Sequence, residues 1–119
     1  MPRGFGRPAT GLMIRDYLLR KKVAYVMQIW REGIVEPCKE QNFKYGCWAD
    51  FSNYFSKLKR LRLVVFDHAE PAPELPGRTF TGEGVQRHYY RLNMERVNDM
   101  EVWRNPIKAL YPHLFNRPR

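Results

Sequence analysis

The stretch from Cys47 to Val65, CWADFSNYFSKLKRLRLVV, decides the fold of this chain. Its apolar residues recur with the period of an amphipathic helix, at Trp48, Phe51, Phe55, Leu58 and Leu61. The opposite side repeats polar and charged residues at the same spacing, namely Asp50, Asn53, Lys57 and Arg60. The pattern therefore predicts a helix over 47–61 with one buried side and one exposed, mainly cationic side.

Directly after this helix the composition changes to that of a β-hairpin. Leu63–Asp67 is short, apolar and rich in β-branched residues, which is typical of a strand. Arg87–Leu92 alternates and is aromatic, so we predict the returning strand there. About 19 residues rich in proline and glycine separate the two runs, which predicts an unusually long connecting loop. The fold class expected from these elements is α+β and mostly helical.

The segment Phe51–Val64, FSNYFSKLKRLRLV, resembles the recognition helix and first wing strand of winged helix-turn-helix domains. That family typically reads apolar-Ser-x-x-apolar-x-x-Leu-x-x-Leu-Gly-Leu-apolar. The resemblance covers about residues 23–92 and implies a recognition helix over 47–61 and a two-stranded wing over 63–92. Arg62 stands where the family prefers glycine. If the helix ends in a left-handed turn, Arg62 costs roughly 1 kcal/mol for its positive φ.

Ahead of this segment the sequence predicts an extra N-terminal helix from Leu12 to about Lys21, with Thr10 as its N-cap. Whether residues 12–32 form one helix or two stays open. A strand over Val23–Trp30 is an alternative, because that run is rich in Val, Tyr, Ile and Trp.

The resemblance implies two further helices before the recognition helix. The family's first helix would lie at Ala24–Glu32 and would end at Gly33, the residue type that favours a helix C-terminus. Its second helix would be a short one over Pro37–Gln41, with proline in the first turn.

The C-terminal part is expected to be helical over 94–115. Asn93 can cap a helix through Met94–Arg104, and Asn105-Pro106 can start a short one that Pro112 ends. Five apolar residues exceed what a small core needs, namely Trp103, Leu110, Tyr111, Leu114 and Phe115. Either they make a homodimer contact between C-terminal helices or they fold back over the first helix.

Length and charge bound the domain organisation and the class of partner. The chain has 119 residues, which fits one winged-helix domain over 12–115 between a basic arm, 1–11, and a basic tail, 116–119. The net charge is +9, of which residues 1–62 carry +8 and residues 63–119 carry +1. Clustered cations favour a polyanionic partner, and nucleic acid is the commonest one.

The sequence lacks the patterns that are typical of several function classes. Cys38 and Cys47 form no C-x-x-C pair, and the three histidines have no metal-ligand spacing, so we expect no metal, no cofactor and free thiols. Whether the two thiols pair is not fixed by the sequence. The chain shows no phosphate-binding glycine loop and no nucleophile elbow, and we expect no enzyme. The sequence contains no bilayer-spanning run or secretory leader, and we expect a cytoplasmic protein without a membrane partner.

The candidate nucleic-acid-binding residues follow from the helix pattern and the resemblance. They are Lys44, Ser52, Asn53, Ser56, Lys57, Lys59, Arg60, Arg78, Arg87, Arg3 and Arg7. Asn53 could bond an adenine edge through two hydrogen bonds, while the cations supply phosphate contacts. Glu70, Glu74 and Glu83 argue against the whole connecting loop lying on nucleic acid.

Three functions are consistent with these observations. The first is a winged-helix transcriptional regulator that binds duplex DNA. The second is a basic RNA-binding or ribonucleoprotein component, such as a ribosome-associated protein, whose arm and tail lie between RNA helices. The third is a protein-interaction module inside a larger nucleic-acid machine, which the acidic loop and the C-terminal aromatics favour.

Overall fold

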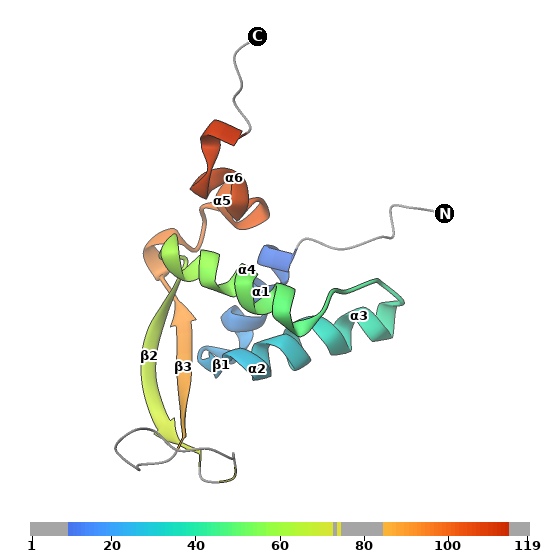
Figure 1. Ribbon diagram of the computed structural model, residues 1–119, viewed down its shortest axis with the longest axis vertical. Helices are drawn as coiled ribbons and strands as arrows, with labels where there is room; N and C mark the ends of the chain where they lie inside the picture. The colour runs from blue at the N-terminus through green and yellow to red at the C-terminus, as the bar shows by residue number, and fades with distance from the viewer. Residues whose placement is uncertain (1–9, 73, 75–84, 115–119) are drawn as a thin grey trace.

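The computed structural model of the protein describes residues 10–72, 74 and 85–114 (Figure 1). Within them the fold is α+β, with helices packed against a three-stranded antiparallel sheet. The elements are α1 (Thr10–Lys21), β1 (Ala24–Tyr25), α2 (Val26–Gln28), η2 (Ile29–Val35), α3 (Glu36–Gln41), α4 (Trp48–Arg60), β2 (Val64–Pro71), β3 (Gln86–Leu92), η3 (Met94–Arg96), α5 (Met100–Arg104), α6 (Pro106–Leu110) and η4 (Pro112–Leu114).

The N-terminal helix α1 confirms the predicted one. It buries Ile14, Tyr17 and Leu18, and it includes Thr10, which the sequence placed ahead of the helix. The helix ends because Lys22 enters the left-handed region at φ 77° and turns the chain into β1. Residues 12–32 therefore hold two helical segments separated by a short strand.

Residues 26–41 form one continuous helical rod, in which the π-helical stretch η2 lies between α2 and α3. This corrects the separate helices expected at Ala24–Glu32 and Pro37–Gln41. Pro37 has no N–H to donate to the preceding turn, and the wider π-helical turns lie directly before it. The rod can therefore pass through a proline without ending.

The sequence suggested that a helix ends at Gly33, but this residue lies buried inside η2. A Cβ at this position would come within 3.1 Å of the Tyr17 ring. The missing side chain therefore allows the rod to approach α1 closely. Gly11 has a similar role in α1, because a Cβ there would collide with the backbone oxygen of Trp103 in α5.

Helix α4 is the amphipathic helix that the sequence predicts. Its buried residues are Phe51, Phe55 and Leu58. Trp48, expected on the same side, is 38% exposed because it lies in the first turn at the edge of the core. It still packs on Phe51, with ring centroids 6.0 Å apart.

The turn that follows α4 has the left-handed geometry expected for Arg62, whose φ is 63°. The Leu63 N–H donates to the Leu58 oxygen at 3.0 Å, and the Arg62 N–H donates to the Lys59 oxygen at 3.0 Å. This pair of bonds is the Schellman arrangement, which satisfies the last carbonyls of the helix and directs the chain into β2.

The predicted hairpin of β2 and β3 is confirmed, and β1 adds a third strand to it. The strand order is β1-β3-β2, with Ala24 opposite Tyr90 and Tyr25 opposite Tyr89. This corrects the expected two-stranded wing. In Figure 1 the hairpin extends away from the C-terminal end of α4, and β1 lies beside β3.

A bulge interrupts β2. Phe66 pairs with Tyr90, but His68 pairs with Tyr89, so two residues of β2 oppose one position of β3. Because neighbouring residues of β3 point to opposite faces of the sheet, Phe66 and His68 do so too. The Phe66 ring lies edge-on to Tyr90 and His88, while the His68 ring stacks on Tyr89 with centroids 4.7 Å apart.

The C-terminal region corrects the single helix expected over Met94–Arg104, which is broken into η3 and α5. Arg96 holds the break in place: its guanidinium donates to the Leu61 oxygen at 2.6 Å and pairs with Asp99 at 2.6 Å. Trp103 is fully buried, and its indole N–H donates to the Arg96 oxygen at 3.0 Å. Trp103 is therefore a core residue and not part of a surplus apolar surface.

The predicted caps in this region are confirmed. The Asn93 side chain accepts from the Glu95 N–H, and the Asn105 side chain accepts from the Lys108 N–H at the start of α6. The helix that starts at Pro106 ends at Leu110, ahead of Pro112 as predicted, and Pro112 then begins the short 3-10 turn η4. Among the predicted surplus residues, Leu110 and Tyr111 are half-buried, and Phe115 lies outside the described residues.

Candidate nucleic-acid interface

The outer face of α4, defined here as Asn53, Ser56, Lys57 and Arg60, is the candidate interface. These residues follow one another at helical spacing, and Lys57 is half-buried while the other three are exposed. Buried aromatic rings on the other side of the helix fix it in the core. The Phe55 ring lies edge-on to Tyr90, with ring centroids 5.3 Å apart. The fold thus presents the polar side of α4 to solvent, as the sequence predicts.

Two predicted cations of α4 contact aromatic rings. The Arg60 guanidinium lies 5.7 Å from the Tyr111 ring centroid and donates to its hydroxyl at 3.0 Å. The Lys59 ammonium lies 5.2 Å from the Tyr90 ring centroid, on the side of α4 that faces the sheet. These contacts orient both side chains, and guanidinium retains further N–H donors that a phosphate could use.

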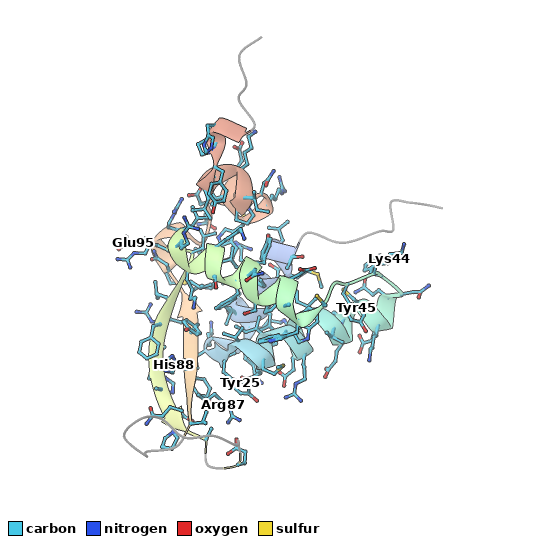
Figure 2. All side chains as sticks on the ribbon, viewed as in Figure 1. Tyr25, Lys44, Tyr45, Arg87, His88 and Glu95 are labelled. Carbon is cyan, nitrogen blue, oxygen red and sulfur yellow. The ribbon has the colours of Figure 1, made fainter. Side chains whose placement is uncertain are left out.

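The remaining predicted residues lie at different places. Ser52 is half-buried in α4, and Lys44 is exposed on the linker between α3 and α4, which Figure 2 places far from Arg87 in β3. Arg87 is half-buried in β3, where it pairs with Glu74 at 2.5 Å and lies over the Tyr25 ring at 4.4 Å. These contacts were not expected from the sequence, and the phosphate contact of Arg87 stays a prediction.

Three predicted cations, Arg3, Arg7 and Arg78, lie outside the residues that the structure describes. The candidate interface therefore consists of the outer face of α4, with Lys59 at its sheet side and Lys44 ahead of it.

A second surface, the wing-side groove, was not found by sequence reasoning. It is formed by β1, α2, η2, the first turn of α4 and β3, and its volume is about 540 Å³. Its principal residues are Tyr25, Met27, Arg31, Trp48, Arg87 and Tyr90. Figure 2 shows Tyr25 and Arg87 side by side at this end of the sheet. No sequence pattern signalled the groove, because Trp48 was predicted on the buried side of its helix.

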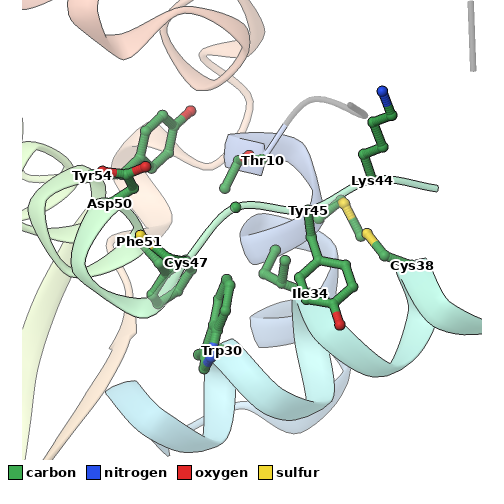
Figure 3. A pocket seen from close by; sticks show the side chains of 12 residues that line it. Thr10, Trp30, Ile34, Cys38, Lys44, Tyr45, Cys47, Asp50, Phe51 and Tyr54 are labelled. Atoms are coloured by element: carbon green, nitrogen blue, oxygen red, sulfur yellow. The ribbon is translucent and has the colours of Figure 1, made fainter. Parts of the chain in front are cut away.

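A smaller pocket of about 150 Å³ lies where the α3–α4 linker meets α1 and α4 (Figure 3). Trp30, Ile34 and Phe51 give it an apolar interior. Cys38 and Cys47 also line it, from different elements, and both thiols are free. Cys38 is buried, and burial raises the pKa of its thiol, whereas Cys47 is exposed.

The ionisable groups with shifted pKa values lie away from the outer face of α4. The carboxylates of Asp67 and Glu70 accept hydrogen bonds from the protonated ring of His68, at 2.6 and 2.9 Å, and thereby raise the pKa of His68. Burial, and then the Glu32 carboxylate at 2.5 Å, raises the pKa of Tyr17. Burial raises the pKa of Tyr54 to about 12. In the described ranges no group of three or more His, Cys, Asp or Glu side chains could hold a metal ion.

Comparison with protein-family models, curated proteins and solved structures finds none that matches this chain. Among the described helices, none combines the length and apolar character that crossing a bilayer requires.

Proposed function

We propose that the protein is a winged-helix protein that binds duplex DNA by placing the outer face of α4 in the major groove. The observation that carries this proposal is the exposure of Asn53, Ser56 and Arg60 on a helix whose opposite side is fixed in the core. A single α-helix fits the major groove of B-DNA, where base edges can be read directly.

Each part of α4 has a distinct role in this proposal. The Asn53 amide can donate to and accept from an adenine edge, which gives sequence preference. Lys57 and Arg60 contact phosphates, which gives affinity that depends on salt. The turn at Arg62 then leads directly into the hairpin, so the wing stands beside the bound duplex. The net charge of +9 favours the encounter with any nucleic acid.

Fluorescence anisotropy with a labelled duplex tests the proposal. The double variant Lys57→Ala/Arg60→Ala should weaken binding at least about tenfold and reduce the slope of log affinity against log salt by about 1.8, because two phosphate contacts are lost. The matched control is Lys22→Ala/Lys39→Ala, which removes the same charge from two exposed residues outside α4. This control should leave most of the affinity in place.

Arg60 needs its own control, because its guanidinium also donates to the Tyr111 hydroxyl. Tyr111→Phe removes that bond without changing the charge, and it should bind duplex DNA like the wild type. Equal losses in the α4 variant and the lysine control would refute groove docking by α4.

Competition with structured RNA and single-stranded DNA at two salt concentrations separates the other functions. Preference for structured RNA would replace the proposal by the RNA-binding function. Absence of specific binding to any of the polymers, together with a stoichiometric protein that copurifies, would replace it by the protein-interaction function.

A further inference from the structure

We propose that the wing-side groove binds unpaired nucleobases of a single-stranded segment, so that the protein prefers duplexes with a single-stranded end. This inference deepens the proposed function and depends on nucleic-acid binding, although it does not depend on how α4 meets the duplex. It rests on the rings, the charges and the size of the groove.

The groove offers ring faces and apolar surface that the core does not need. Trp48 is 38% exposed, with its ring stacked on Phe51 at an interplanar angle of 29°, and it lines the groove. Met27, 41% exposed, lies in the same groove. Tyr25, which is half-buried, adds a further ring, whereas Tyr90 also lines the groove but is a buried core residue with its ring edge-on to Phe55. Flat side chains fixed in this way are the surfaces on which unpaired bases stack.

The charges of the groove match an anionic occupant. Arg31 and Arg87 line it, and none of its described lining residues is acidic. Arg87 keeps its place over Tyr25 while pairing with Glu74, so Arg31 is the lining cation best placed to meet a phosphate. Cations that alternate with rings favour a single-stranded nucleic acid over an apolar peptide.

The size of the groove also suits this ligand. A volume of about 540 Å³ falls in the range of pockets that accept small organic molecules. Trp48 belongs to the first turn of α4, on the side that carries Phe51, so the groove and the outer face proposed to meet the duplex lie on different sides of one helix. A single-stranded end of a bound duplex would therefore pass around α4 to place its unpaired bases in the groove.

The experiment compares a blunt duplex with the same duplex carrying a short single-stranded overhang that contains 2-aminopurine. Anisotropy reports affinity, and quenching of 2-aminopurine reports stacking. We expect the wild type to bind the overhang duplex more tightly and to quench the probe. Because stacking contributes about 1–3 kcal/mol per base, losing one stacked base should reduce the preference about five- to 150-fold.

Two substitutions of one residue separate stacking from general apolar contact. Trp48→Phe keeps a ring and should retain most of the preference and the quenching. Trp48→Leu keeps apolar surface without a ring and should lose both, with blunt-duplex affinity unchanged. Ile107→Ala is the control at an equally exposed apolar residue outside the groove. Arg31→Gln removes a cation of the groove, and its control is Arg104→Gln, which removes the same charge from an exposed arginine outside the groove.

The outcomes distinguish the two proposals. Equal binding of blunt and overhang duplexes, or equal behaviour of Trp48→Phe and Trp48→Leu, overturns the inference and leaves duplex binding by α4 intact. Binding of an apolar peptide in competition with the overhang, without quenching, would show that the groove takes protein. Loss of blunt-duplex binding in Lys57→Ala/Arg60→Ala supports the proposed function and does not test the groove.

Discussion

Replacing Arg62 by glycine should stabilise the protein by about 1 kcal/mol. Arg62 has φ 63°, a region in which a side chain costs about 1–2 kcal/mol and glycine costs little. Part of the gain is lost because glycine gives up about 0.5–1 kcal/mol more conformational entropy on folding. The side chain of Arg62 is exposed, and its carbonyl, which accepts from Asn93 at 2.8 Å, is unchanged by the substitution.

The assay is urea denaturation followed by far-ultraviolet circular dichroism, with the slope m compared between variants. A gain of about 1 kcal/mol should raise the melting temperature by about 3–6 °C for a domain of this size. Arg62→Ala distinguishes relief of backbone strain from loss of charge, because it removes the same charge but keeps the Cβ. This variant should show no increase in the free energy of unfolding. Asn42→Gly, at φ 60°, should give a smaller gain because asparagine tolerates this region.

A variant Arg62→Gly that is no more stable than the wild type, at unchanged m, would refute the reasoning. So would an equal gain from Arg62→Ala, since relief of charge repulsion would then explain the result.

Three further predictions concern packing, protonation and thiol access. Gly11→Ala should destabilise the protein by about 1–3 kcal/mol in the same assay, although alanine favours helices, because the new methyl group meets a backbone oxygen of α5. The pKa of His68, followed by NMR, should lie above the ordinary value of about 6.5 and should fall in Asp67→Asn; the stabilisation is present below that value and is lost as pH rises through the folded pKa. Cys47 should react with a thiol reagent in the native protein, while Cys38 should react only after unfolding, and equal rates would contradict its burial.

The features that the sequence predicted are those set by local pattern. The helix over 47–61 and the left-handed turn at Arg62 depend on spacings within a few residues, and α4 ends within one residue of the predicted end. The strands around Val64 and Tyr90 were found for the same reason. The short strand β1 was foreseen only within the alternative strand over Val23–Trp30, because it exists through pairing with β3, more than sixty residues away in the chain.

The candidate site was predictable to a similar extent. The polar side of α4 follows from its period, so Asn53 and Arg60 were placed correctly on the exposed side. The contacts of Arg87 with Glu74 and Tyr25 were not predicted, because these partners lie in other segments of the chain. The wing-side groove is built from five elements of the chain, and no local spacing encodes it.

The bulge in β2 has a consequence for how this hairpin can change in evolution. Because the bulge takes up one extra residue, His68 pairs with Tyr89 as it would in a strand without Asp67, so deleting a single residue there would leave every later side chain of β2 on its present side. The histidine stacked on Tyr89 would keep its place, while the strand would lose the bend and the extra twist that the bulge gives it. Changes in length at this position would therefore alter the direction of the outer hairpin, whereas substitutions would decide which chemistry it offers to a partner.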